Sequence, residues 1–278
     1  MSKKSKSSFY YTFAFLQKNK REAIKTVYAF CRKTDDIVDN NFESLELRFE
    51  NLKKWKSDFE LSLKGKSKNP IFVELKHVTD FYKIPTKPFY DLIDCVEMDL
   101  VKNRYENFDE LKKYCYNVAS TVGLMTIPIF GYKNSSTEKF AINLGIALQL
   151  TNIIRDVKTD AQNNRIYLPK EDLRKFGYSE SELVNSTYNE KFVELMKFQT
   201  NRARKFYNEA DKFLSSKDRS NMFTARAMEY IYLRLLDKIE QENYDVFSKK
   251  IRVSNINKIF IALSVFIKYK TLYKWLNA

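Results

Sequence analysis

Two pairs of aspartates have a spacing that could do chemistry. Asp35 and Asp39 lie four positions apart near the end of an apolar segment, and Asp156 and Asp160 repeat this spacing further along the chain. Residues four apart on a helix project from one face, so each pair brings two like charges together. Such a pair destabilises a helix unless cations neutralise it, and Mg²⁺ prefers oxygen ligands. The spacing therefore favours two carboxylate sites for a divalent cation.

The second pair belongs to a longer polar row. Asn152 precedes Asp156 and Asp160 in an i, i+4, i+8 register, and Gln149 falls on the same side of an otherwise apolar segment. A solvated surface stripe would give the same spacing, and this is the alternative for either cluster taken alone. The presence of two such clusters in one chain favours the metal interpretation.

Basic residues accompany both acidic groups. Arg32 precedes the first, and Arg155 and Arg165 surround the second. Carboxylates, Mg²⁺ and guanidinium groups together are the components of a diphosphate clamp. The alternative is ordinary ion pairing on a helix surface, which contributes little and would not require Asn152 and Gln149 in an apolar helix.

Other kinds of catalytic site find little support. His77 is the only histidine, and no nucleophile motif surrounds it, so we expect a surface or packing role. Cys31, Cys95 and Cys115 are odd in number and form no CxxC pair, which argues against a disulfide framework and a structural zinc site. The chemistry must then come from carboxylates, Lys, Arg, Tyr or a metal.

The elements that must position these residues are predicted to be helices. The chain has 278 residues, 44% of them hydrophobic, with only 5 Gly and 5 Pro, which favours one all-α domain over residues 1–278. A polar loop at 161–178 should contain a short extended piece at 165–169. The predicted helices cover 20–40, 45–63, 71–82, 85–102, 108–128, 135–160, 190–213, 220–243 and a segment from 255.

The charge balance is strongly basic. Lys and Arg number 49 against 35 acidic residues, a net charge of +14, which suits phosphates, nucleic acid or an anionic membrane surface without choosing among them. The apolar segment from Asn255 is too short to span a bilayer, and we expect a packed terminal helix rather than a membrane-surface contact. The polar, basic start lacks a signal core, so we expect a cytoplasmic protein.

Several motifs resemble those of the squalene/phytoene synthase family, from Ser7 to about Tyr269. Ser8-Phe9-Tyr10-Tyr11 together with Glu97-Met98-Asp99-Leu100 is most similar to the bacterial presqualene diphosphate synthases of hopanoid biosynthesis, although phytoene synthases share the Asp-rich signatures. The motifs that carry the family resemblance are Tyr28-Ala29-Phe30-Cys31-Arg32-Lys33-Thr34-Asp35-Asp36-Ile37-Val38-Asp39, Tyr114-Cys115-Tyr116 with Val118-Ala119 and Gly123, Leu148-Gln149-Leu150-Thr151-Asn152-Ile153-Ile154-Arg155-Asp156, and Arg165-Ile166-Tyr167-Leu168-Pro169.

The resemblance implies an isoprenoid synthase helical bundle around a central apolar cavity. It implies that Tyr116 supplies a hydroxyl near the reacting diphosphate. The residues implied to bind Mg²⁺ are Asp35, Asp39, Asn152, Asp156 and Asp160, and those implied to contact substrate diphosphates are Ser8, Tyr28, Arg32, Gln149, Arg155, Arg165 and Tyr232.

Three positions depart from the family pattern. Lys158-Thr159 stands where Gly-Glu is common, which should lower local metal affinity. Ser120 replaces a common Gly and is expected to narrow the cavity near Tyr116. Lys6 stands where some relatives have Ser, which keeps an anion-binding role for the segment from Ser5 to Ser8.

The expected reaction is the Mg²⁺-dependent head-to-head condensation of two farnesyl diphosphates to presqualene diphosphate, with release of pyrophosphate. The alternatives within the family are a phytoene synthase using geranylgeranyl diphosphate and a squalene or dehydrosqualene synthase, for which NADPH matters only if a reductive step follows. A nucleic-acid-binding module would not explain two acidic clusters, since these repel phosphate without metal, and the intact aspartates argue against an inactive assembly factor. We expect a prenyl diphosphate substrate, no nucleic acid, a monomer or weak homodimer, and at most peripheral contact with the inner face of the membrane.

Overall fold

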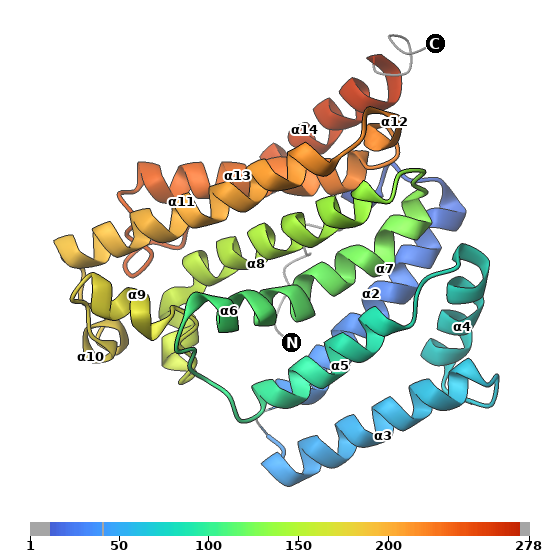
Figure 1. The fold of residues 1–278 in the computed structure, drawn as a ribbon, viewed down its shortest axis with the longest axis horizontal. Helices are drawn as coiled ribbons and strands as arrows, with labels where there is room; N and C mark the ends of the chain where they lie inside the picture. The colour runs from blue at the N-terminus through green and yellow to red at the C-terminus, as the bar shows by residue number, and fades with distance from the viewer. Residues whose placement is uncertain (1–11, 41, 273–278) are drawn as a thin grey trace.

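Long amphipathic segments with few helix breakers fold into a layered bundle of helices (Figure 1). The computed structural model describes residues 12–40 and 42–272. Within these ranges the only strand-like pairing is an isolated parallel bridge between Arg104 and Ile166. The prediction of an all-α fold is confirmed, and the bridge lies in the short extended piece predicted after the second acidic helix.

The observed helices match most predicted spans closely. The predicted helix over 85–102 is observed only as Lys87–Asp99, and the one predicted over 108–128 is divided by a π-helical segment. The elements are α2 (Lys18–Val38), α3 (Leu45–Leu63), α4 (Pro70–Tyr82), α5 (Lys87–Asp99), α6 (Phe108–Cys115), η1 (Tyr116–Ser120), α7 (Thr121–Phe130), α8 (Ser136–Gln162), α9 (Lys170–Lys175), α10 (Glu180–Val184), α11 (Glu190–Phe213), α12 (Ser216–Arg219), α13 (Phe223–Gln241), α14 (Asn255–Phe266) and η2 (Ile267–Leu272).

Helix α8 lies in the middle of the bundle. It packs against α11 on one side and against η1 and α7 on the other, and α2 lies beyond α7 (Figure 1). Helices α3 and α4 form one edge of the bundle, and α14 lies along the opposite edge against α13. The two helices that carry the acidic motifs, α2 and α8, are therefore both internal elements.

An aromatic core fixes the position of α2. The ring of Phe30 lies 5.2 Å from that of Phe89 and 5.8 Å from that of Phe59, and all three side chains are fully buried. The indole of Trp55 donates a hydrogen bond to the hydroxyl of Thr34 at 3.0 Å. These contacts lie one turn before Asp35, so packing rather than charge places the first acidic motif.

The π-helical segment η1 approaches α8 very closely. A Cβ atom added to Gly145 would lie 2.5 Å from the Cα of Ser120, so only glycine fits at this crossing. The buried hydroxyl of Ser120 donates to the carbonyl of Ile142 at 2.7 Å. Glycine and serine thus bring the backbones of η1 and α8 together.

The histidine, the cysteines and the apolar helices lie as follows. His77 is exposed on α4, in agreement with a surface role. The three cysteines are buried and unbonded. None of the helices in the described ranges is long and apolar enough to cross a membrane.

We expect Gly145→Ala to lower the free energy of unfolding by about 1–3 kcal/mol, because the added methyl collides with backbone that cannot swing away. Urea denaturation followed by circular dichroism measures the loss. Gly123→Ala is the matched control, because Gly123 lies on α7 where this helix faces α8, and its Cβ would lie 3.2 Å from the carbonyl oxygen of Ala141 and should perturb the fold less. A Gly145→Ala protein more stable than the parent would contradict the close crossing.

Candidate active site

The first acidic motif lies at the C-terminal end of α2. Asp35 and Asp36 are in the last turn, and Asp39 caps the helix with its N–H donating to the carbonyl of Asp35. Burial raises the pKa of Asp35 to about 7, and the charge of Asp39 adds to this. Arg32 pairs with Asp36 at 2.9 Å. Since the helix dipole is negative here, this end attracts cations.

The second acidic motif lies near the C-terminal end of α8. Asp156 forms an ion pair with the adjacent Arg155, with 2.7 Å between Nε and Oδ1. Burial raises the pKa of Asp160 to about 7, followed by the charge of Asp156, while Arg165 and Arg155 oppose the rise. The negative charge of Asp39 also raises the pKa of Asp160. The two acidic motifs are therefore close enough to interact, and they face each other across the bundle.

Arg165 joins the two motifs. Its guanidinium donates to Asp39 Oδ1 at 3.1 Å, and its backbone N–H donates to the carbonyl of Asp160 at 2.8 Å. The extended piece that follows is held by the N–H of Ile166, which donates to the carbonyl of Asn103. The position of Arg165 is therefore set by backbone pairing, and its charge compensates carboxylates of both motifs.

Polar side chains mark the inner edge of this acidic site. Asn152 Nδ2 donates to Gln149 Oε1 at 3.3 Å. Burial raises the pKa of the neighbouring Tyr232 hydroxyl, and Arg155 and Asn152 oppose this rise. The carbonyl oxygen Oδ1 of Asn152 is buried without a hydrogen-bond partner. A buried acceptor of this kind is costly unless a cation or other donor satisfies it.

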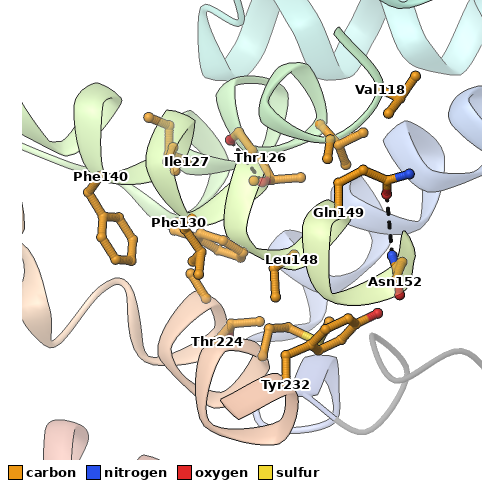
Figure 2. A pocket seen from close by; sticks show the side chains of 18 of the residues that line it. Val118, Thr126, Ile127, Phe130, Phe140, Leu148, Gln149, Asn152, Thr224 and Tyr232 are labelled. Carbon is orange, nitrogen blue, oxygen red and sulfur yellow. Dashed lines mark hydrogen bonds between the residues drawn. The ribbon is translucent and has the colours of Figure 1, made fainter. Parts of the chain in front are cut away.

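An apolar cavity begins at these polar side chains. Figure 2 shows the tips of Gln149, Asn152 and Tyr232 together at one end, with Phe130 and Phe140 at the other. The cavity measures about 170 Å³ and is lined by η1, α7, α8 and α13. Its lining does not include Ser120, whose hydroxyl bonds to α8, so the expectation that this residue narrows the cavity is wrong.

A cluster of tyrosines around Asp99 was missed as part of the site. The rings of Tyr105, Tyr114 and Tyr167 lie 5.1 to 5.8 Å apart, and the hydroxyls of Tyr114 and Tyr167 are 3.3 Å apart. Burial raises the pKa of Asp99 to about 7, opposed by Arg165 and by hydrogen bonds from Tyr114 and Tyr105. Asp99 therefore connects Tyr114 to Arg165 and the acidic site. The only sequence signal was its place in the Glu97-Met98-Asp99-Leu100 motif.

Tyr116 lies elsewhere. It lines a separate polar pocket with Lys87, Asp91, Asp94 and Lys113 between α5 and η1. Positions two apart in a helix point in nearly opposite directions, so Tyr114 and Tyr116 cannot both face the aspartates. The structure thus places Tyr116 in this polar pocket, whereas Tyr114 lies against Tyr167 and Asp99, close to Arg165.

The other predicted residues are placed as follows. Tyr28 and Arg32 lie on the same side of α2 as Asp35, with their side chains about half exposed or less. Ser8 and the segment around it lie outside the described residues. Lys158 turns away from the aspartates and donates to the carbonyl of Phe247 at 2.6 Å.

A further basic group near the site comes from the C-terminal part of the chain. Burial lowers the pKa of Lys258 below its usual value, and the positive charges of Arg155 and Arg252 lower it further. Lys258 therefore lies near both Arg252 and Arg155, although it stands about a hundred positions after Arg155 in the sequence. Local patterns could not have joined it to the site.

The side-chain oxygens of the acidic site suit a cation that is also bound by water molecules or by phosphate groups of a substrate. Among the described residues, no three carboxylate, thiol or imidazole groups enclose a position where a metal could bind. The carboxylates come instead as pairs, with the unsatisfied oxygen of Asn152 beside them. Mg²⁺ usually keeps several waters and takes one or two carboxylates together with substrate phosphates, so this arrangement fits Mg²⁺ and a phosphate ligand.

Comparison with known proteins gives concordant results. Residues 2–257 match the family model of squalene/phytoene synthases. The chain is 36% identical to a 15-cis-phytoene synthase of Synechococcus elongatus and 37% identical to a phytoene synthase of Arthrospira platensis, each over 91% of this chain and 85% of the relative.

Solved structures agree with this match. A dehydrosqualene synthase crystallised with a ligand superposes with a TM-score of 0.84 and 30% identity, covering 97% of this chain and 94% of that one. The squalene synthase HpnC of Alicyclobacillus acidocaldarius superposes with a TM-score of 0.78 over 85% of this chain and 89% of its own, and at 23% identity it supports the fold.

Proposed function

The chain belongs to the squalene/phytoene synthase family of prenyltransferases, and we propose that it condenses two farnesyl diphosphates head to head to presqualene diphosphate, releasing pyrophosphate. One observation supports the proposal most directly. The acidic ends of α2 and α8 face each other, are linked by Arg165, and lie next to an apolar cavity. An acidic site that can bind cations, next to an apolar cavity, matches a substrate with a diphosphate head and a hydrocarbon tail.

Recognition of the head group falls to the two acidic motifs and the arginines beside them. Mg²⁺ held by Asp35, Asp39, Asn152, Asp156 and Asp160 would supply positive charge that stabilises the leaving pyrophosphate. Arg155 and Arg165 present guanidinium forks whose donors match phosphate oxygens. Both are ion-paired with aspartates, so a bound diphosphate would take over part of their hydrogen bonding.

The bond changes require a dry chamber. The allylic C–O bond of one substrate breaks, and its electron pair leaves with pyrophosphate. The double bond of the second substrate then adds to the allylic cation, and loss of one proton closes the cyclopropane ring. Water would trap the cation as an alcohol, so the apolar walls around Phe130 and Phe140 protect the reaction as well as bind the tail.

Tyr114 is the hydroxyl best placed to handle the proton. It lies between Tyr167 and the carboxyl group of Asp99, next to Arg165 at the end of the acidic site. A buried hydroxyl in a hydrogen-bonded chain can accept or pass on a proton without admitting bulk water. We assign this role to Tyr114 rather than to Tyr116.

A phytoene synthase using geranylgeranyl diphosphate is the second candidate. It is favoured by the 36–37% identity to cyanobacterial proteins named phytoene synthases. The farnesyl proposal is supported by the superposition on a protein named dehydrosqualene synthase. At about 170 Å³ the cavity is smaller than the roughly 300–1,000 Å³ of typical ligand pockets, so the helices around it must separate to admit either substrate.

The test is a product assay. Purified protein with Mg²⁺ is incubated with farnesyl or geranylgeranyl diphosphate, with and without NADPH, and products are identified by mass spectrometry after phosphatase treatment. We expect a presqualene alcohol from farnesyl diphosphate, independent of NADPH. Squalene formed only with NADPH would add a reductive step, phytoene would select the second candidate, and no condensation of either substrate would refute both.

We expect Asp35→Asn and Asp156→Asn each to abolish measurable turnover while leaving the helical circular dichroism unchanged. Each substitution removes a negative charge needed to hold the cation without changing side-chain volume. Asp80→Asn, at an exposed position on α4, is the matched control and should keep full activity. Full activity in both site variants would end the metal-clamp hypothesis.

For the two tyrosines, we expect Tyr114→Phe to lower kcat about 100-fold, since a positioned acid or base contributes on this order. Tyr116→Phe should leave kcat within about twofold, because its hydroxyl lies in a different pocket. Steady-state kinetics of both variants under saturating Mg²⁺ makes the comparison. The reverse ranking would restore the role first expected for Tyr116.

A further inference from the structure

Helix α14 buries only a narrow part of its surface. Its buried side chains are Ala262 and Val265, and the ring of Phe266 stacks on Phe15 at 5.1 Å and meets Phe223 at 5.4 Å. These contacts fasten one side of the helix to the bundle. The expectation of a packed terminal helix is therefore met on one side only.

The other side of α14 is apolar and exposed. Ile256, Ile259, Phe260 and Leu263, here called the α14 stripe, follow i, i+3, i+4, i+7 spacing and so share one face. Ile256 and Phe260 keep 66% and 65% of their surface exposed. Single exposed apolar residues are ordinary, but a continuous stripe along one helix marks an interaction surface.

The segment that contains the stripe carries side-chain charge of one sign, although Lys249 pairs with Glu242, which precedes the segment, at 2.5 Å. From Val246 to Ala278 the sequence contains no Asp or Glu and seven basic residues, which are Lys249, Lys250, Arg252, Lys258, Lys268, Lys270 and Lys274. Lys249 and Lys250 precede the helix and Lys268 follows it, all of them exposed. Lys274 lies outside the described residues. An apolar stripe with cations at both ends is complementary to a surface that is anionic outside and apolar beneath.

We propose that the α14 stripe docks on the surface of an anionic lipid bilayer, with the helix lying in the plane of the interface. Helix α14 continues directly into η2, and no helix in the described residues is long and apolar enough to cross a bilayer. A second copy of the chain is a poorer occupant, because a twofold contact would set this basic segment against itself. Helices α3 and α4 lie at the opposite edge of the bundle and would face away from the membrane (Figure 1). The proposal stands independently of which prenyl diphosphate is the substrate.

The experiment uses the full chain and flotation with vesicles. One set is phosphatidylcholine alone, and the other contains equal parts of phosphatidylcholine and phosphatidylglycerol. We expect binding to the anionic vesicles, weakened by high salt, and little binding to the neutral ones. Absence of binding to anionic vesicles at low salt would overturn the proposal.

Two variants test the surface itself. Ile256→Ser with Phe260→Ser should lower the vesicle partition coefficient at least about tenfold by removing apolar insertion. Lys250→Glu with Lys268→Glu, at two exposed positions on either side of α14, should lower it about tenfold at low salt while leaving the stripe intact. Phe81→Ser is the matched control, since Phe81 is 78% exposed on α4 and should not affect binding.

The outcomes separate membrane docking from its rivals. Thermal unfolding and circular dichroism of each variant establish that the fold is kept. Unchanged vesicle binding in both double variants would refute the assigned surface. A dimer seen by light scattering that disappears with Ile256→Ser and Phe260→Ser, without vesicle binding by the parent protein, would assign the stripe to a second copy and overturn the proposal.

Discussion

Mutual repulsion among carboxylates at the ends of α2 and α8 is the constraint that organises this molecule. Asp35 and Asp160 are both sufficiently buried that their pKa values rise to about 7, and both helices present their negative dipole ends to the same region. Arg165 relieves part of this repulsion by bonding to Asp39 while its backbone is tied to Asp160. Bound cations would complete the balance, and an anionic substrate that arrives with metal would enter a region whose carboxylates are already placed to hold that metal.

Exposed ion pairs are too weak to hold such an arrangement, which must come from packing. The aromatic core around Phe30 fixes α2 one turn before Asp35. The crossing at Gly145 fixes α8 against η1 less than two turns before Asn152, since no side chain separates the two backbones. The same crossing sets one wall of the apolar cavity. Tightly packed contacts therefore lie directly behind the charged groups that would meet the substrate.

The sequence predicted what depends on local periodicity. The helix spans, the shared face of Asp35 and Asp39 and the row from Asn152 to Asp160 all follow from one helical repeat. The prediction did not reach the tyrosine cluster, because the Arg104–Ile166 bridge joins two loops about sixty positions apart. The family resemblance pointed to Tyr116 and not to Tyr114. The two residues point in opposite directions on a helix, and only the packing of α6 and η1 shows which of them lies beside Asp99.

The positive charges of the chain lie in different surroundings. The segment 246–278 carries seven positive and no negative side chains, so it accounts for half of the net charge of +14. Elsewhere several arginines are satisfied internally, as Arg204 is by Asp237 and Glu240. A nucleic-acid surface would pair its cations with polar donors and stacking rings, whereas the exposed stripe in this segment is mostly aliphatic, with one ring, Phe260, among isoleucine and leucine side chains. Lys258 of the same segment lies near Arg155. The helix with the exposed apolar face is thus continuous with residues beside the acidic site, and this suits substrates that combine a hydrocarbon tail with a charged head.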